Sequence, residues 1–194
     1  MTGGLDEKKV LKQIAEIDRV NKKLGGEIRV LKGSECDILK DGSLDLPDRV
    51  LEKLEVVGAS VHSLFHLDRA AQTKRIIRAM ENPQVDILFH PTGRILKKRD
   101  PYEVDMEAII AAAKRTRTVL EIDAYPDRLD LKDEYIRKCV EMGVKLAIDS
   151  DAHAPGHFPL LEYGIAQARR GWAERKDIIN AWPLEKMKNL LKRK

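Results

Sequence analysis

The sequence has no long apolar run, and this absence excludes a membrane-spanning helix. No segment reaches the roughly 18 consecutive apolar residues that a bilayer requires, and no apolar signal-peptide core follows the N-terminus. Cysteine is also scarce, with Cys36 and Cys139 far apart and outside any CxxC spacing. This pattern favours reduced thiols over a disulfide framework. We therefore expect a soluble protein of the cytoplasm.

The chain also lacks a strong excess of charge of either sign. Its 36 Lys and Arg residues against 32 Asp and Glu residues give a net charge of only +4, which permits an anionic partner without requiring one. No basic run with interleaved aromatic residues occurs, and the terminal "LLKRK" is typical of a solvated helix end. With 194 residues, 43% of them hydrophobic, the chain is long enough for one domain, residues 1–194, with a substantial core.

Apolar, β-prone segments alternate with amphipathic ones along the chain. We expect strands at 27–38, 56–63, 85–91, 118–126 and 145–153. Helices are expected at 5–24, 46–54, 67–82, 100–116 and 131–143, followed by a helical tail that is broken near Trp182. Asp100 is expected to cap the fourth of these helices, with Pro101 at its first position. This alternation predicts an α/β fold with a parallel sheet of about five strands, built from βαβ units.

Several of the predicted strands end in a side chain that can bind a metal. Glu35, His62 and His90 end three of them, and the fifth ends in Asp151 and His153. The carboxyl ends of parallel strands emerge on one face, so we expect these five side chains to converge. Carboxylate oxygens and imidazole nitrogens suit Zn²⁺, Mn²⁺ or Fe²⁺. The sequence therefore predicts a metal centre on that face.

Each of these residues also has an ordinary structural interpretation. A single histidine at a strand end is more often structural than a ligand, and Glu35 alone would serve as an ion-pair partner. Asp149 is interpreted as an ordinary N-cap or loop acceptor outside the site. Asp123 is interpreted as a residue that supports the ligands. His66 and His157 each lie in a loop just past a strand end, and we treat them as secondary candidates for lining the site.

Two arginines follow strand ends and could hold a phosphate beside the metal. Arg94 comes four residues after His90, and Arg128 comes five residues after Asp123. A guanidinium binds phosphate with two parallel hydrogen bonds. A surface arginine paired with a nearby carboxylate is an equally good interpretation of either residue.

At these residues the sequence resembles a known superfamily. The segments "GSECDILKDGSLDLP", "ASVHS", "DILFHPTGR", "LEIDAYPDRLDL" and "DSDAH" are together similar to the PHP (polymerase and histidinol phosphatase) superfamily. The similarity is strongest to the C-terminal PHP domain of family X DNA polymerases. It implies a distorted, TIM-like (β/α)7 barrel that holds up to three divalent metals. It also implies a metal-dependent phosphoesterase, acting as a 3′–5′ exonuclease or a DNA 3′-end processing enzyme in the polymerases and as a phosphatase in stand-alone relatives.

The resemblance assigns roles to individual residues. It matches Glu35 with the acidic bridging ligand, His62 and His90 with the two histidines that follow, and Asp151 and His153 with the final Asp-x-His pair. The implied cofactor is Zn²⁺, with Mn²⁺ as the alternative. A bound metal would lower the pKa of its water to about 7, so no serine or cysteine nucleophile is required. A phosphate ester, such as a DNA end, is the implied substrate, with Arg94 or Arg128 binding its phosphate.

The resemblance is incomplete in two respects. Relatives usually have Asn where this chain has Asp123, and the superfamily's opening His-x-His and Asp-His motifs are absent. We therefore expect an incomplete barrel, truncated at its N-terminus relative to the superfamily, from a family X DNA polymerase. The alternative is a PHP remnant with little or no activity that serves as a metal-binding or interaction module.

The missing strands carry an expectation about assembly. They would leave the strands at 27–38 and 145–153 as open edges, and unpaired backbone groups at an open edge seek partners. We expect a homo-oligomer, or association with a polypeptide that supplies the missing strands. The helix at 5–24 is the alternative cover for one edge.

Overall fold

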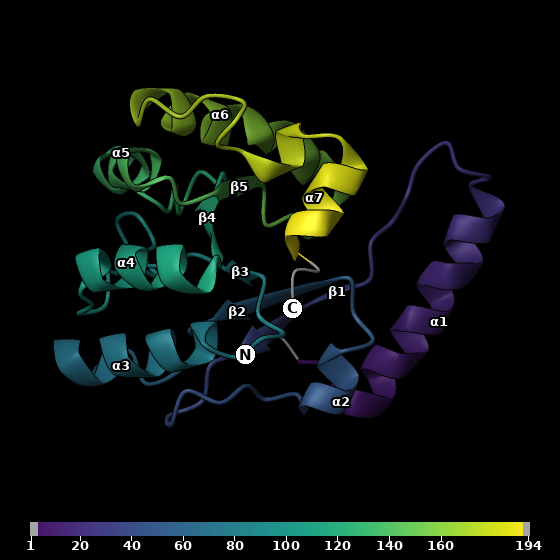
Figure 1. Ribbon diagram of the computed structural model, residues 1–194, viewed down its shortest axis with the longest axis horizontal. Coiled ribbons are helices and arrows are strands. Elements are labelled where there is room, and N and C mark those ends of the chain that lie inside the picture. Colours follow the sequence, from purple (N-terminus) through teal and green to yellow (C-terminus); the bar gives the residue numbers. More distant parts are fainter. Residues whose placement is uncertain (1–3, 192–194) are drawn as a thin grey trace.

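The protein folds around one parallel sheet with the strand order β1-β2-β3-β4-β5 (Figure 1). The computed structural model describes residues 4–191. The strands are β1 (Gly33–Asp37), β2 (Val56–Ser60), β3 (Ile87–Leu88), β4 (Val119–Asp123) and β5 (Leu146–Asp149). The α-helices are α1 (Glu7–Lys23), α2 (Asp48–Leu51), α3 (Arg69–Met80), α4 (Met106–Thr116), α5 (Asp133–Met142), α6 (Leu161–Arg170) and α7 (Leu184–Leu191), and two 3₁₀ helices are η1 (Pro155–Leu160) and η2 (Ile179–Ala181). This arrangement confirms the predicted α/β fold and the incomplete TIM-like barrel.

The two faces of the sheet bury two separate apolar clusters. Helices α3 to α6 stack beside one another along the outer face, whereas α7 lies on the opposite side (Figure 1). Successive side chains of a strand point to opposite faces of the sheet, so they pack into the two clusters in turn. In β3, for example, Leu88 belongs to the larger cluster under α3 to α6, and Ile87 belongs to the smaller cluster with Leu191 of α7. We call the side of the sheet that carries α7 its inner face. Polar side chains that follow the strands on this face therefore lie above the smaller cluster.

One edge of the sheet is covered, which corrects an expectation. The sequence predicts an open edge at the strand 145–153, but the segment after α6 pairs with it. The N–H of Leu146 donates to the carbonyl of Asp177 at 2.9 Å. Asn180 then uses both ends of its amide, accepting from the N–H of Ile148 at 3.1 Å and donating to the carbonyl of the same residue. A side-chain amide carries one acceptor and one donor group, so it replaces a neighbouring strand at this position.

The opposite edge, β1, is only partly covered. Asp45 binds both backbone groups of Asp37: its carboxylate accepts from the N–H of Asp37 at 2.9 Å, and its own backbone N–H donates to the carbonyl of Asp37 at 3.1 Å. Every second residue of a parallel strand bonds to the same neighbour, so Gly33 and Glu35 direct their backbone groups away from β2. Helix α1 stands on this side of the molecule (Figure 1), and a cavity of about 580 Å³ lies between Gln13 of α1 and β1.

The helix expected at 100–116 begins later than predicted. It starts at Met106, where Asp105 caps it by accepting from the N–H groups of Glu107 and Ala108, both at 3.1 Å. The preceding residues are held by Tyr102, whose N–H donates to the carbonyl of Thr92 at 3.1 Å. Asp100 therefore does not cap the helix, because Tyr102 holds this segment in an extended path back to the strand ends.

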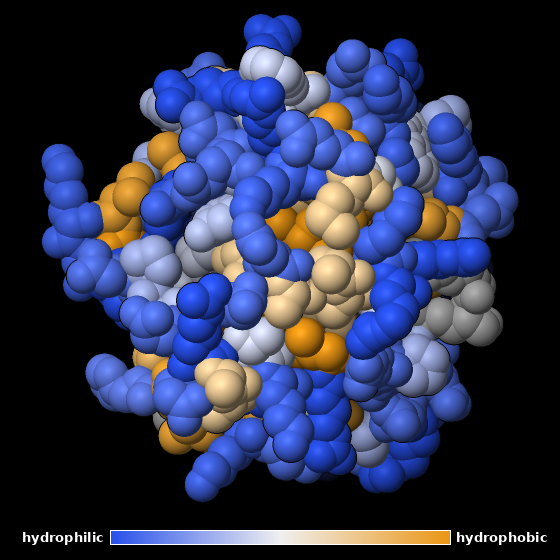
Figure 2. Space-filling view, turned by 60° about the vertical axis from the view of Figure 1, so that its left-hand side comes forward, coloured by the Kyte–Doolittle hydropathy of each residue, from blue (hydrophilic) through white to orange (hydrophobic). Residues whose placement is uncertain are grey.

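The surface is predominantly hydrophilic. Figure 2 shows one face on which charged and polar side chains surround a central apolar patch and smaller ones near the rim, in keeping with the charged fraction of 35%. Across residues 4–191 no helix combines the length and the apolar character needed to cross a membrane.

Candidate metal centre

Three of the predicted ligands meet at the carboxyl ends of neighbouring strands. Glu35 comes from β1, and His62 and His90 follow β2 and β3. The Oε1 atom of Glu35 lies 3.3 Å from Nε2 of His62 and 3.0 Å from Nε2 of His90. One ligand atom from each residue falls within 4.8 Å of the others. We call this group the Glu35–His62–His90 cluster.

The spacing of the cluster fits a small divalent cation. Zinc binds nitrogen and carboxylate oxygen at about 2.1 Å, so neighbouring ligands of a tetrahedral ion lie about 3.4 Å apart. The separations of 3.3 and 3.0 Å from Glu35 to the two histidines are close to that value. The donor set of two imidazoles and one carboxylate also suits this class of metal. The residues present therefore fit a divalent metal ion.

Asp37, which sequence reasoning missed, supports the cluster from outside. Its Oδ1 lies 2.5 Å from Nδ1 of His62, on the side of the ring opposite Glu35. A carboxylate on the outer nitrogen fixes the tautomer and orientation of a metal-binding imidazole. The signal was in the sequence, because Glu35 and Asp37 are two residues apart in one strand and therefore share a face.

His90 reaches the cluster through an unusual backbone conformation. Phe89 and His90 both line a cavity of about 400 Å³ on the inner face, although neighbours in a regular strand point to opposite faces. His90 has a φ of 29°, a conformation that side chains seldom adopt and that turns its ring inward. Gly58 leaves room for Phe89, because a Cβ atom there would lie 1.9 Å from the Phe89 ring.

The contacts within the cluster change the pKa values of its members. Burial alone would raise the pKa of Glu35, but hydrogen bonds from His62 and His90 outweigh it and hold that pKa well below its ordinary value. The hydrogen bond to Glu35 raises the pKa of His62 to about 9, with a further contribution from Asp37 and opposition from burial. Without a metal, His62 therefore carries a proton at neutral pH.

A set of buried carboxylates lies beside the cluster. Glu121 accepts a hydrogen bond from the backbone N–H of His90, which ties β4 to the cluster. Burial raises the pKa of Glu121 well above its ordinary value and raises that of Asp149 in the same direction. Burial likewise raises the pKa of Asp123 to about 8. Sequence reasoning did not place Glu121 near the site and left Asp149 outside it, yet both line the same cavity as Glu35 and His90.

The remaining predicted ligands lie near the cluster but outside it. Asp151 lines the cavity shared with Glu35, whereas His153 borders the cavity beside β1. The ring of His153 is largely exposed, and its Nδ1 donates to the carbonyl of Asp151 at 2.7 Å. His66 belongs neither to the cluster nor to the lining of these two cavities. The structure thus brings three of the five predicted ligands together and holds the final pair beside them.

The two arginines occupy different positions. Arg94 binds backbone carbonyls, donating from Nε to Arg128 at 2.9 Å and from Nη2 to Leu129. Arg128 faces the carboxylates instead, with Nε 3.2 Å from Asp123 and 3.7 Å from Asp151. Arg94 therefore holds the loop that carries Arg128, and Arg128 is the guanidinium nearer to the site.

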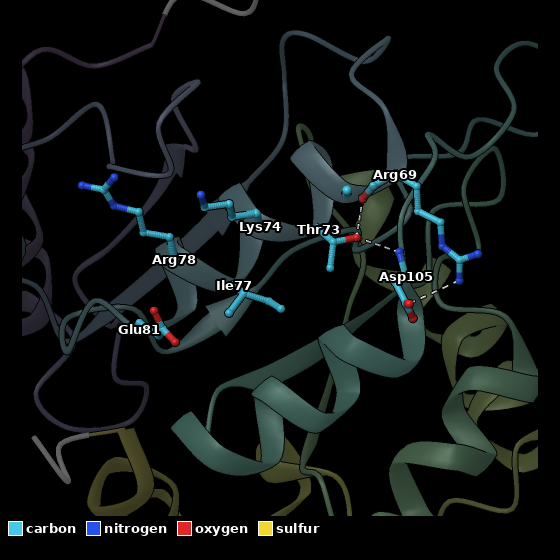
Figure 3. Close-up of a pocket in the computed structure, with 8 residues that line it drawn as sticks. Arg69, Thr73, Lys74, Ile77, Arg78, Glu81 and Asp105 are labelled. Atoms are coloured by element: carbon cyan, nitrogen blue, oxygen red, sulfur yellow. Dashed lines mark hydrogen bonds and ion pairs between the residues drawn. The ribbon is translucent and has the colours of Figure 1, made fainter.

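A larger hollow of about 630 Å³ lies elsewhere, on the outside of α3 (Figure 3). The contacts at its end join two helices: the hydroxyl of Thr73 donates to the carbonyl of Arg69 at 2.6 Å and accepts from the N–H of Asp105 at 2.9 Å. Arg69 and Asp105 also form an ion pair of 3.4 Å. None of the predicted site residues lines this hollow.

Comparison with known proteins finds relatives that include a probable phosphatase and a DNA polymerase with 3′-5′ exonuclease activity. The chain is 33% identical over 177 residues to a probable phosphatase of Thermoanaerobacter sp. (strain X514), covering 86% of this chain and 69% of the relative. The chain belongs to the PHP superfamily. This PHP domain is also 41% identical over 193 residues to the DNA polymerase/3′-5′ exonuclease PolX of Bacillus subtilis (strain 168). That match covers 100% of this chain and 34% of the polymerase, so the chain spans about a third of that relative's length. No protein-family model matches the chain.

Proposed function

We propose that this PHP domain is a metal-dependent phosphoesterase that hydrolyses phosphate esters, including those at DNA 3′ ends. The observation that carries the proposal is the Glu35–His62–His90 cluster, whose ligand atoms have the spacing that a divalent ion requires. The probable phosphatase and the polymerase with 3′-5′ exonuclease activity to which the chain is similar support the same chemistry. Zn²⁺ is the ion that we propose, with Mn²⁺ as the alternative.

The surrounding residues have distinct roles in this proposal. A bound divalent ion would supply Lewis acidity and an activated water molecule for attack at phosphorus. Glu35, His62 and His90 would hold the ion, and Asp37 would keep the imidazole of His62 oriented toward it. The ion's positive charge would also offset the repulsion between a phosphate and the buried carboxylates.

We propose Arg128 as the phosphate-binding residue. Its guanidinium is paired with Asp123 and Asp151, at 3.2 and 3.7 Å. Asp151 is also a proposed metal ligand, and a carboxylate that turns to a metal releases its arginine. Arg128 would then keep only its pairing with Asp123 and could turn its other guanidinium N–H groups to a phosphate oxygen, while Arg94 keeps the loop in place through the backbone carbonyls that it binds.

A second candidate function, a metal-binding or interaction module without turnover, is favoured by one observation. His153 points its Nδ1 to a backbone carbonyl and is 64% exposed, so the final ligand pair is not assembled with the cluster. An incomplete ligand set misplaces the reacting water, and a displacement of about 1 Å can lower a rate roughly 100-fold. We therefore expect weak turnover by the isolated chain.

The test combines metal content with hydrolysis. The chain is stripped of metal, reloaded with Zn²⁺ or Mn²⁺, and assayed on p-nitrophenyl phosphate and on a 5′-labelled oligonucleotide. We expect activity that EDTA abolishes, and a loss of metal of about tenfold in His90→Ala. His66→Ala is the matched control, because His66 lies outside the cluster.

The outcomes separate the two candidates. Equal metal content in His90→Ala and the parent chain would exclude the proposed site. Metal binding without hydrolysis of either substrate would favour the module. Robust, EDTA-sensitive turnover would contradict the expected weakness and point to further ligands that join the cluster.

A further inference from the structure

One large aromatic side chain stands exposed at the rim of the cavity beside the metal centre. Phe158 of η1 is 62% exposed, yet it lines the same 400 Å³ cavity as Glu35 and His90. One part of this cavity is formed by carboxylates, and another part is apolar, formed by Phe89, Ile148, Leu161 and Phe158. A small number of polar groups facing an apolar wall is the usual composition of a site for a small ligand.

The position of Phe158 is fixed by its neighbour. His157 packs its ring edge-on against Tyr125, with 5.5 Å between the ring centroids. Its Nδ1 also accepts a hydrogen bond from the N–H of His153 at 3.2 Å. These two contacts attach η1 to the ends of β4 and β5. They therefore fix the segment that carries Phe158 at the mouth of the cavity.

The exposed ring has no aromatic partner of its own. No ring among residues 4–191 stacks on Phe158, whereas Phe65 stacks on Tyr102 and receives the guanidinium of Arg99. An aromatic face left open beside a reactive centre suits a flat, aromatic ligand, and every nucleobase has such a face. The neighbouring carboxylates can in turn accept hydrogen bonds from the amino groups of a base.

We propose that Phe158 stacks on the terminal base of a DNA strand whose phosphodiester lies at the metal centre. This inference rests on the proposed function and deepens it, because it names the substrate class as a nucleotide unit and not any phosphate ester. The similarity to a polymerase with 3′-5′ exonuclease activity favours a DNA end over a peptide or a second copy of the chain. Phe158 then selects the substrate, and the cluster acts on its phosphate.

The experiment measures binding and does not depend on turnover. Two oligonucleotides are compared in Mn²⁺ by fluorescence anisotropy, each with a fluorescein at its 5′ end and a phosphorothioate as its last linkage. One ends in 2-aminopurine, a fluorescent base, and the other ends in an abasic tetrahydrofuran. We expect Phe158→Ala to weaken binding of the base-ended strand about tenfold and to leave the abasic strand unchanged. Phe158→Trp should keep the preference and quench the 2-aminopurine.

Trp172→Ala is the matched control. Trp172 is 63% exposed, close to the value for Phe158, but it packs under Arg137 and does not line the cavity. This variant should bind both strands as the parent chain does. If Phe158→Ala weakens both strands equally, or neither, or if the parent shows no preference for the terminal base, the stacking proposal is wrong.

The same data keep this proposal distinct from the proposed function. A base preference that depends on Phe158 but is accompanied by no hydrolysis of any substrate would support stacking and refute the phosphoesterase. Hydrolysis without such a base preference would support the phosphoesterase and refute stacking.

Discussion

Asp37 provides the sharpest test of how the metal centre is built. Its carboxylate lies 2.5 Å from Nδ1 of His62, so it holds the ring with Nε2 directed at Glu35. Removal of such a supporting carboxylate typically lowers metal affinity by 10- to 100-fold. Because the side chain of Asp37 is 43% exposed and water can partly replace it, we expect the lower end, about tenfold, for Asp37→Ala.

The size of this loss should depend on pH. Asp37 also helps to raise the pKa of His62, after the larger contribution from Glu35, and so stabilises a proton that a metal must displace. Removing Asp37 lowers the affinity of His62 for this competing proton as well as its affinity for the metal. The loss of affinity should therefore be smaller at pH 6.5 than at pH 8.5, where less of the competing proton remains.

The assay is a competition titration of Zn²⁺ against a chromophoric chelator at both pH values. Asp37→Asn should lose less than Asp37→Ala, because the amide oxygen still accepts from Nδ1 of His62. Asp41→Asn is the control, since Asp41 follows the same strand but bonds to Ser43. Unchanged affinity of Asp37→Ala at both pH values would show that Asp37 does not orient the ligand.

Three further predictions follow from the same structure. First, Zn²⁺ affinity of the parent chain should rise about tenfold per pH unit through the neutral range and level off near pH 9, because the pKa of His62 is raised to about 9; a flat profile from pH 6.5 to 8.5 would contradict this. Second, Gly58→Ala should lower the free energy of unfolding by about 1–3 kcal/mol, because its Cβ would lie 1.9 Å from the ring of Phe89. Denaturant titration measures this against Gly156→Ala, where a Cβ has nothing within 4 Å, and equal stability of the two variants would refute the packing argument. Third, the outward-facing backbone of Gly33 and Glu35 in β1 should promote self-association or binding of an added strand; a strictly monomeric chain in light scattering over a wide concentration range would show that the edge is sufficiently covered.

The order of the elements and the convergence of the main ligands follow from local features of the amino-acid sequence. Strand and helix periodicities are local, so the alternation could be predicted from neighbouring residues alone. In a parallel sheet, the positions of Glu35, His62 and His90 at strand ends are enough to bring them to one face. Neither inference needed a contact between distant residues.

Other features depend on contacts between distant residues and arise only in the folded protein. Asn180 covers β5 from 32 residues away, and Asp37 meets His62 across 25 residues. His90 faces the cavity because its backbone adopts a φ of 29°, which reverses the regular alternation of the strand. No local pattern encodes these arrangements, because each is stable only where packing and hydrogen bonds from other strands outweigh the local preference of the chain.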